Sequence, residues 1–296
     1  MATVKKAIIP VAGLGTRFLP LSKAVPKELW PLVDKPVIQY IVEEAKASGI
    51  KEIIFVTRPK RDLVFDYFEN KLRTKRVSKA KYRNHFQEDL KKLEKLTKGI
   101  SFSRVFQKNP LGDGHALLQA KDLVKKEPCA VLWADDVVES KTPCLLQLIK
   151  VFEECKKSVL GLARVPKESF QFYGMIEGNK TKGRTYKIKR IAEKPEPKDS
   201  PSNLAVVGRY ILTPDVFNFL EKADYNQRGE IVLDEVLSEK LKDGLEVCGC
   251  EFEGKWLECG NKSAYLKSNL YLALKHPRFG KELKESLRTW RNRQTR

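Results

Sequence analysis

Residues 7–18 read Ala7-Ile8-Ile9-Pro10-Val11-Ala12-Gly13-Leu14-Gly15-Thr16-Arg17-Phe18, an apolar run that leads directly into a turn with two glycines. The apolar run predicts a buried β-strand. Two glycines directly after a strand let backbone amides approach an anion closely. Together they predict the start of an α/β sheet whose ligands bind just beyond the carboxyl ends of its strands.

The same alternation of short apolar strands and helix-period segments continues along the chain. Apolar residues at 37, 38, 41, 42 and 45 have helical spacing, and Gly49 ends that segment. The other predicted elements are strands at 52–57, 102–106, 129–133 and 158–163 and helices at 116–120 and 145–155. This order predicts an α/β fold with a Rossmann-like, mostly parallel central sheet and helices on both faces.

Length and composition describe a globular chain. With 296 residues, 42% of them hydrophobic, the chain can bury a substantial core, and disorder, collagen and mucin are excluded. Six cysteines without a C-x-x-C pair are typical of reduced cytosolic thiols. Neither a signal peptide nor an apolar run of about 18 residues is present, so we expect a cytoplasmic protein that does not span a membrane.

The charge is strongly positive. Lys and Arg number 57 against 38 Asp and Glu, a formal net charge of +19, which favours an anionic partner. Basic tracts at 71–83 and 288–296 suggest a nucleic-acid-binding protein as an alternative function. No recognised binding motif accompanies these tracts, and basic residues on helices usually form a solvated face. We therefore expect no dedicated nucleic-acid partner.

The turn after the first strand differs from the two common phosphate-binding motifs. Phe18 stands where G-x-G-x-x-G needs its third glycine, and no G-x-x-x-x-G-K-[ST] occurs. A plain glycine-rich turn is therefore an alternative. Arg17 favours phosphate binding because a guanidinium can hold phosphate oxygens in a bidentate way. Lys27, on a loop stiffened by Pro26, adds a second positive charge.

Several segments, in order and spacing, carry a family resemblance. They are residues 13–20, 26–40, Gln107 with 112–116, Asp135-Asp136, Tyr173-Gly174, 193–195, 203–210 and 259–262. Together they cover most of residues 5–275 and resemble the sugar-nucleotide pyrophosphorylases. The long, charged and helical segment from about 62 to 99 resembles the uridylyltransferase branch of that family, since the thymidylyltransferase branch has a much shorter connection here.

The resemblance implies an enzyme. It would join UTP and glucose 1-phosphate into UDP-glucose and pyrophosphate in a Mg²⁺-dependent nucleotidyl transfer, by direct in-line attack of the sugar phosphate on the α-phosphorus. It implies a single nucleotidyltransferase domain over 1–296, with a nucleotide-binding half up to about 140, a sugar-phosphate-binding half at about 141–275 and a basic tail at 276–296. It also implies a homodimer or homotetramer, to which a helix with Leu266, Leu270, Ala273 and Leu274 could contribute. Packing of that helix on the chain's own core is the alternative.

The same resemblance assigns roles to residues. The implied catalytic residues are Arg17, Lys27, Asp135 and Lys194. The implied nucleotide-binding residues are Ala12, Gly13, Leu14, Gly15, Thr16, Glu28, Gln107, Gly112 and Gly114. The implied sugar-phosphate-binding residues are Gly174, Glu193, Lys194, Asn203 and Val207. Asp135 is the implied Mg²⁺ ligand, and Glu258 is a further candidate although the family commonly has aspartate there.

Other interpretations stay open on the residues alone. Asp135 and Asp136 could cap a helix, and Glu193 with Lys194 could form a surface salt bridge. Gln107 and His115 could be satisfied polar groups, and Tyr173-Gly174 a simple turn. At the level of function, the alternatives are a nucleotidyltransferase for dTTP or another sugar, and an inactive regulatory relative. The charged side chains at Arg17, Lys27, Asp135 and Lys194 argue against lost activity.

Overall fold

The computed structural model describes residues 4–59, 62–69 and 83–294. Of the two basic tracts, residues 71–82 and 295–296 lie outside the described residues. The strands are β1 Lys6–Pro10, β2 Pro31–Leu32, β3 Lys35–Pro36, β4 Glu52–Thr57, β5 Ser101–Phe106, β6 Cys129–Leu132, β7 Asp136–Glu139, β8 Ser158–Arg164, β9 Gly174–Lys180, β10 Thr185–Glu193, β11 Leu204–Leu212, β12 Val247–Glu251 and β13 Lys255–Glu258.

Some of the helices lie at the predicted periodic segments, and others were not predicted. The α-helices are α1 Val37–Ala47, α2 Leu63–Glu69, α3 Arg83–Thr97, α4 Asp113–Leu118, α5 Lys121–Val124, α6 Cys144–Cys155, α7 Pro214–Lys222, α8 Leu233–Lys242, α9 Lys262–Lys275 and α10 Gly280–Gln294. Four short 3₁₀ helices are η1 Thr16–Phe18, η2 Leu21–Lys23, η3 Lys27–Leu29 and η5 Lys167–Phe172 among the described residues. Apart from small boundary shifts, the strands and helices predicted above are present among the described residues. Within the helical segment expected from about 62 to 99, α2 and α3 are described and residues 70–82 are not.

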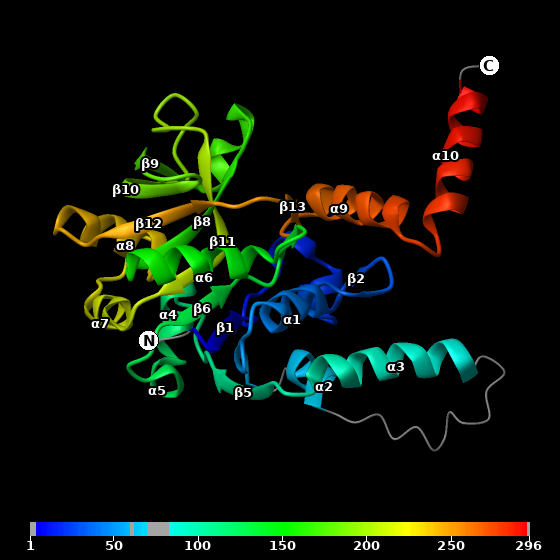
Figure 1. Ribbon diagram of the computed structural model, residues 1–296, viewed down its shortest axis with the longest axis horizontal. Helices are drawn as coiled ribbons and strands as arrows, with labels where there is room; N and C mark the ends of the chain where they lie inside the picture. The colour runs from blue at the N-terminus through cyan, green and yellow to red at the C-terminus, as the bar shows by residue number, and fades with distance from the viewer. Residues whose placement is uncertain (1–3, 60–61, 70–82, 295–296) are drawn as a thin grey trace.

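One large sheet organises the molecule, with strand order β5-β4-β1-β6-β11-β8-β12-β10-β9 (Figure 1). β5, β4, β1 and β6 run parallel to one another, and β8 runs parallel to its neighbour β12. β11 and β10 run antiparallel to theirs. The predicted α/β fold is confirmed, with a fully parallel N-terminal part and a mixed C-terminal part.

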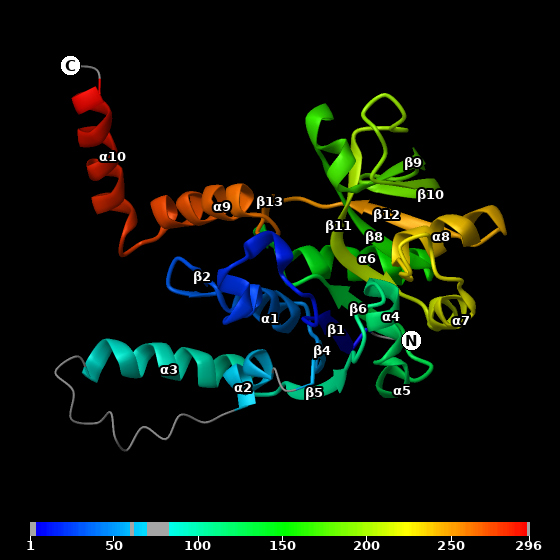
Figure 2. The same cartoon turned by 180° about the vertical axis from the view of Figure 1, so that it is seen from behind.

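Apolar cores lie on both faces of this sheet because strand side chains alternate in direction. Ala7 and Ile9 of β1 belong to one core, which α1, α2 and α6 cover, whereas Ile8 belongs to the other. That second core lies under α4, α5, α7 and α8. Figures 1 and 2 show the two helical layers from opposite sides.

The parallel strands β5, β4, β1 and β6 end at the same edge of the sheet. The chain leaves β1 into the glycine turn, β5 into Gln107, and β6 into the segment with Asp135. Asp136 begins strand β7, which pairs with β13, so the two aspartates do not cap a helix. This edge therefore collects the polar residues that the sequence singled out.

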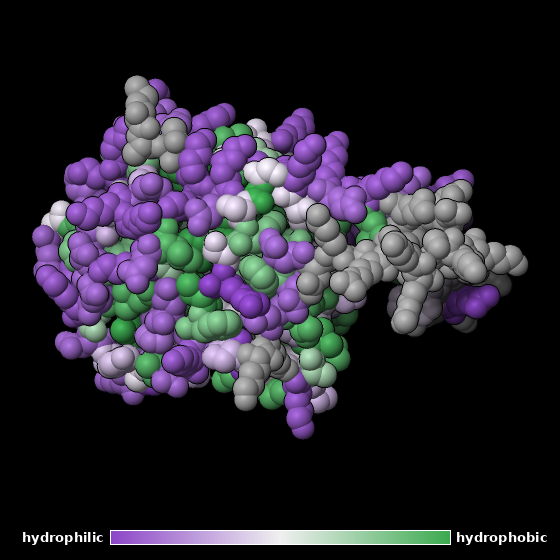
Figure 3. All heavy atoms as spheres, turned by 90° about the horizontal axis from the view of Figure 1, so that it is seen from below, coloured by the Kyte–Doolittle hydropathy of each residue, from purple (hydrophilic) through white to green (hydrophobic). Residues whose placement is uncertain are grey.

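The C-terminal helices leave the body of the molecule. α9 leads away from the sheet and α10 turns off at its end (Figure 2). The face drawn in Figure 3 is mainly hydrophilic, with apolar side chains in small patches. All six cysteines are free thiols. In the described part of the chain, no helix has both the length and the apolar character that a membrane span requires.

Candidate active site

The turn after β1 is shaped by its two glycines. Gly15 has φ 65°, a left-handed conformation that suits glycine, and it starts η1 with Arg17. A Cβ added at Gly13 would meet no atom within 4 Å, so its backbone faces open space. A cavity of about 460 Å³ lies against this turn. Its walls include Ala12, Gly13, Leu14, Thr16, Lys27, Glu28, Gln107, Gly112, Asp113, Trp133 and Asp135.

Gln107 lies in the wall of this cavity and binds the neighbouring turn at Gly112. Its side-chain Nε2 donates a hydrogen bond to the carbonyl of Gly112 at 2.9 Å. Gly112 has φ 100°, and an added Cβ would lie 2.3 Å from the carbonyl oxygen of Ile231, so only glycine fits there. Gln107 therefore holds a tight turn in place, and its carbonyl oxygen is the group that it can still offer to a ligand.

Lys27 and Asp135 form the central ion pair. Lys27 Nζ lies 2.5 Å from Asp135 Oδ2, and both side chains are largely shielded from solvent. Burial alone would raise the pKa of Asp135, but the ammonium of Lys27 outweighs it and lowers that pKa. Burial likewise opposes the charge of Lys27, and Asp135 and Glu28 outweigh it and raise the pKa of Lys27. The pair is therefore fully ionised at neutral pH.

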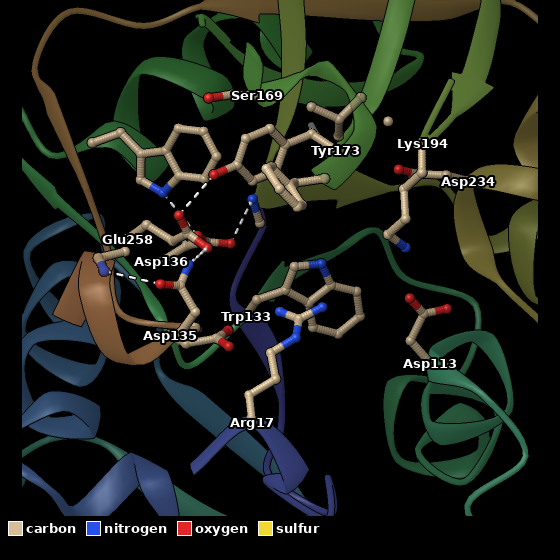
Figure 4. Close-up of a pocket in the computed structure, with 18 of the residues that line it drawn as sticks. Arg17, Asp113, Trp133, Asp135, Asp136, Ser169, Tyr173, Lys194, Asp234 and Glu258 are labelled. Carbon is tan, nitrogen blue, oxygen red and sulfur yellow. Dashed lines mark hydrogen bonds between the residues drawn. The ribbon is translucent and has the colours of Figure 1, made fainter. Parts of the chain in front are cut away.

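A second and larger cavity, of about 840 Å³, opens on the other side of Asp135. Arg17 and Asp135 line it from the N-terminal part of the sheet, and Gly174, Glu193 and Lys194 from the C-terminal part (Figure 4). The two cavities share Asp113, Trp133 and Asp135 in their walls. Asp135 therefore stands where two neighbouring compartments meet.

Lys194 is held in an unusual backbone conformation. Its φ is 45°, which is uncommon for a residue with a side chain. Its ammonium forms an ion pair with the neighbouring Glu193, and the Lys194 side chain is 41% exposed. The salt bridge considered as an alternative for Glu193 and Lys194 is therefore present, and such a partly exposed pair contributes little to stability.

Glu258 lies close to Asp135. A Cβ added at Gly260 would be 3.0 Å from Asp135 Oδ2 and 3.5 Å from Glu258 Oε1, so both carboxylates border the same small space. Glu258 also accepts hydrogen bonds from the Tyr173 hydroxyl at 2.7 Å and from Asn261 Nδ2 at 3.1 Å. The glycine at 260 leaves room for a small group between these oxygens.

Asp136 has a structural task. It accepts hydrogen bonds from the amide of Gly208 at 3.1 Å and from Trp256 Nε1 at 2.7 Å. Burial, together with the neighbouring charge of Asp135, raises the pKa of Asp136 to about 7. Asp136 lines the larger cavity with both oxygens engaged by β11 and β13, whereas Asp135 lines both cavities.

Four of the predicted site residues do not line these two cavities. The amide of Gly114 donates to the carbonyl of Ile231 at 2.9 Å, and that glycine is packed against Ile231 and Leu220. Asn203 accepts a hydrogen bond from Arg164. Val207 is buried in the core on the α1 side, and its neighbour Val206 lines the larger cavity. Gly15 lines a small pocket behind the turn.

The structure adds residues that the sequence reasoning did not single out. Trp133 stands in both cavity walls, and its place at the end of β6, just before the aspartates, was a readable signal. Asp113 and Asp234 line the larger cavity, where burial raises the pKa of Asp113 to about 6. Burial and the charges of Glu193 and Asp113 raise that of Asp234 as well. Asp234 lies 41 residues beyond Glu193, and nothing in the sequence links them.

The fold agrees with that of known proteins. Residues 6–274 match the family model described as nucleotidyl transferase, and the chain belongs to this family. One relative is the UTP–glucose-1-phosphate uridylyltransferase of Staphylococcus haemolyticus, which is 42% identical over 96% of this chain and 97% of its own length.

Solved structures similar to this chain include UDP-glucose pyrophosphorylases. A UDP-glucose pyrophosphorylase complexed with UDP-glucose has a TM-score of 0.85 at 35% identity, over 93% of this chain and 100% of its own. A UTP-bound enzyme of the same kind from Acinetobacter baumannii has a TM-score of 0.84 at 33% identity, over 96% of this chain and 99% of its own. The resemblance inferred from the motifs is confirmed.

Proposed function

We propose that this protein transfers the uridylyl group of UTP to glucose 1-phosphate, forming UDP-glucose and pyrophosphate. The observation that carries the proposal is the position of Asp135 and Trp133, which stand in the walls of both cavities. A nucleotide in the cavity beside the glycine turn and a sugar phosphate in the larger one would meet at Asp135. The names of the relatives described above support the same substrates.

The reaction requires little proton transfer by the protein. A phosphate oxygen of glucose 1-phosphate attacks the α-phosphorus of UTP in line, a new P–O bond forms, and the bond to the β-phosphate oxygen breaks. That attacking oxygen is already ionised at neutral pH, so no general base is needed. The site supplies alignment and neutralises negative charge.

Cations beside the glycine turn fit the triphosphate. Arg17 follows the turn directly, and its side chain reaches into the space beside Trp133 (Figure 4). Its guanidinium would hold phosphate oxygens in a bidentate way, and Lys27 would add a point charge. Ala12, Gly13, Leu14 and Thr16 would face the nucleotide with their backbone. Glu28 and Gln107, in the same cavity, would contact the uracil.

The residues present fit a magnesium ion. Among the described residues, no group of three or more His, Cys, Asp or Glu side chains forms a metal cage. Mg²⁺ in phosphoryl-transfer sites needs only one or two carboxylates and takes its other ligands from phosphates and water. Asp135 would hold it, with Glu258 beside the space that Gly260 leaves open. When bound, the ion neutralises phosphate charge in the transition state.

The larger cavity fits the sugar phosphate. Lys194 would bind the phosphate, and Glu193 would accept hydrogen bonds from sugar hydroxyls. Gly174 lets its backbone lie close to Asp234 in the cavity wall, since an added Cβ would lie 2.7 Å from Asp234 Oδ2. Asn203 and Val207 face elsewhere and have no part in the proposed site. The division into a nucleotide-binding half up to about residue 140 and a sugar-phosphate-binding half at about 141–275 stays a prediction.

A substrate panel tests this function. Pyrophosphate release would be measured for UTP and dTTP, each crossed with several sugar 1-phosphates including galactose 1-phosphate. We expect the fastest release with UTP and glucose 1-phosphate, and none without Mg²⁺. No release with any pair, together with tight and specific duplex binding in a salt titration, would favour the nucleic-acid alternative instead.

We further propose a homodimer or homotetramer. On α9, Tyr265 and Ser268 are buried against the body, whereas Leu266 and Leu270 are 65% and 48% exposed. Leu266 and Leu270 lie one helical turn apart, and in the proposed oligomer a second copy would cover this apolar surface. Light scattering on the purified protein would test this, and a monomer at all concentrations would refute it. A cytoplasmic location stays a prediction, supported by the six free thiols.

A further inference from the structure

Arg209 of β11 is a fully buried arginine with all of its donors in use. Its guanidinium binds Glu44 of α1 through two hydrogen bonds, Nε to Oε1 at 3.0 Å and Nη2 to Oε2 at 2.9 Å. It also donates to the carbonyls of Gly208 at 2.8 Å, Asp136 at 2.5 Å and Trp133 at 3.3 Å. These five bonds match the five N–H groups that an arginine carries.

The sheet is built to admit this side chain. The pairing of β11 with β8 shifts register between Val207 and Tyr210, which leaves Arg209 without a partner on β8. Such irregularities redirect a side chain, often beside an active site. On β8, a Cβ added at Gly161 would lie 3.1 Å from Cβ of Arg209. A Cβ added at Gly208 would collide with Asp136 and Trp133, at 2.3 and 2.4 Å. Glycines thus bring the arginine and the loop together.

The carbonyls that Arg209 binds flank one residue of the site. Trp133 precedes Asp135 by two positions, and Asp136 follows it directly. The carbonyl of Asp135 itself accepts the amide of Cys259 at 2.7 Å. On the other side of the pair, Glu44 Oε1 also accepts the amide of Leu145, at the start of α6. The guanidinium therefore ties the loop with Asp135 to α1, and Glu44 links α1 in turn to the start of α6.

We propose that Arg209 is a positioning residue that holds the loop of residues 133–136 so that the carboxylate of Asp135 can bind the divalent ion. This inference rests on the proposed function, since it assumes that Asp135 is the metal ligand. Residues that orient a metal ligand commonly change metal affinity about 10–100-fold when they are replaced. A role in fold stability alone would leave the metal affinity of the folded protein unchanged.

The test uses Mn²⁺ as the probe, because sites made of carboxylates and water accept both Mg²⁺ and Mn²⁺. Mn²⁺ binding to the full-length protein with saturating UTP, and no sugar phosphate, would be followed by electron paramagnetic resonance. UTP affinity in EDTA and thermal unfolding would be measured beside it. Arg209→Lys removes the planar guanidinium that binds the carbonyls of Trp133, Gly208 and Asp136. Glu44→Gln removes the negative charge of the ion pair, and the guanidinium keeps its bonds to those carbonyls. The double variant Glu44→Met with Arg209→Met replaces the buried pair by apolar groups.

We expect Arg209→Lys and the double variant to weaken Mn²⁺ binding about 10–100-fold, with UTP affinity in EDTA unchanged. Glu44→Gln should change Mn²⁺ affinity far less, at a similar loss of thermal stability. Equal effects of Arg209→Lys and Glu44→Gln, or wild-type Mn²⁺ affinity in the double variant, would overturn the proposal. If neither Arg209 variant folds, the pair serves the fold and the positioning role is rejected. Wild-type protein that does not bind UTP would instead contradict the proposed function.

Discussion

Lys27 and Asp135 lie in direct contact, with 2.5 Å between Nζ and Oδ2, although 108 positions separate them in the sequence. Lys27 belongs to the loops after β1, and Asp135 follows β6, the strand beside it in the sheet. The contact joins the cation that would bind the triphosphate to the carboxylate that would bind its metal. Opposite charges within this pair keep both groups ionised in the free protein.

Asp135→Asn should abolish the response to Mg²⁺ together with most of the activity. A neutral amide is a poor magnesium ligand, and the metal supplies several kcal/mol of charge stabilisation, so we expect a fall of about three orders of magnitude. Pyrophosphate release would be measured across a Mg²⁺ titration, with UTP affinity in EDTA as the control. An unchanged Mg²⁺ response would remove Asp135 from the metal site.

Arg17→Ala should lower turnover by about 10²–10³-fold, the effect of losing one charge-stabilising donor. Arg17→Lys is the matched variant, because it keeps the positive charge and loses the fork, and it should fall between wild type and alanine. Turnover at saturating substrates is the measurement. A loss of less than threefold in Arg17→Ala would mean that other groups hold the triphosphate.

Gly260→Ala should weaken Mg²⁺ activation without unfolding the protein. The added methyl group would lie 3.0 Å from Asp135 Oδ2 and so would intrude on the space between the two carboxylates. We expect the half-saturating Mg²⁺ concentration to rise about tenfold, as for other changes around metal ligands. Circular-dichroism melting would confirm the fold. A folded variant with normal Mg²⁺ dependence would show that the ion does not use this space.

Lys194→Met should raise KM for glucose 1-phosphate about 10–100-fold, since a hydrogen bond from a charged donor is worth about 1.5–3 kcal/mol. The apparent affinity for UTP should stay within threefold, because Lys194 lines the larger cavity from the C-terminal part of the sheet, whereas Arg17 lines it from the side of the glycine turn. Lys198→Met, at an exposed lysine on the same loop, is the control and should behave like wild type. A selective loss of UTP affinity would contradict the assignment of the two cavities.

The buried carboxyl of Glu28 predicts a pH-dependent stability. Burial raises its pKa from 4.5 to about 7, so the folded protein keeps a proton that the unfolded chain has already released. This contribution favours the folded state at low pH and is lost as pH rises from 4.5 through 7, by up to about 3 kcal/mol.

Glu28→Gln removes this titration. The stability of the variant relative to wild type should therefore be greater at pH 8 than at pH 5, as measured by urea unfolding at both values. The comparison of two proteins at each pH cancels the titration of all other groups. An identical difference at pH 5 and pH 8 would show that Glu28 titrates normally.

The sequence alone predicted the elements well where the periodicity was strong. The run at 52–57 and the helical repeat from Val37 match β4 and α1 because apolar spacing follows the geometry of each element. The charged residues expected at the strand ends also lie at the cavities. This could be predicted because parallel strands place their carboxyl ends at one edge.

Long-range contacts decided the rest. Val207 and Val206 are alike in sequence, but the pleat of β11 turns Val207 into the core on the α1 side and Val206 toward the larger cavity. Asp136 resembles Asp135 locally, yet its oxygens are taken by Gly208 and Trp256 from distant strands. Sequence spacing carries no information on such pairings, because side-chain direction depends on register.

Local chemistry along the chain thus determined the α/β character, the glycine turn and the kinds of charge available for phosphate binding. Only the tertiary structure decided that Lys27 contacts Asp135 and that Glu258 borders the space beside Asp135. It also decided that Arg209 binds the carbonyl of Asp136, in the loop that carries Asp135. The physical reason is that backbone preferences and apolar periodicity act over a few residues. Ion pairs and cavities instead depend on which strands become neighbours when the sheet forms.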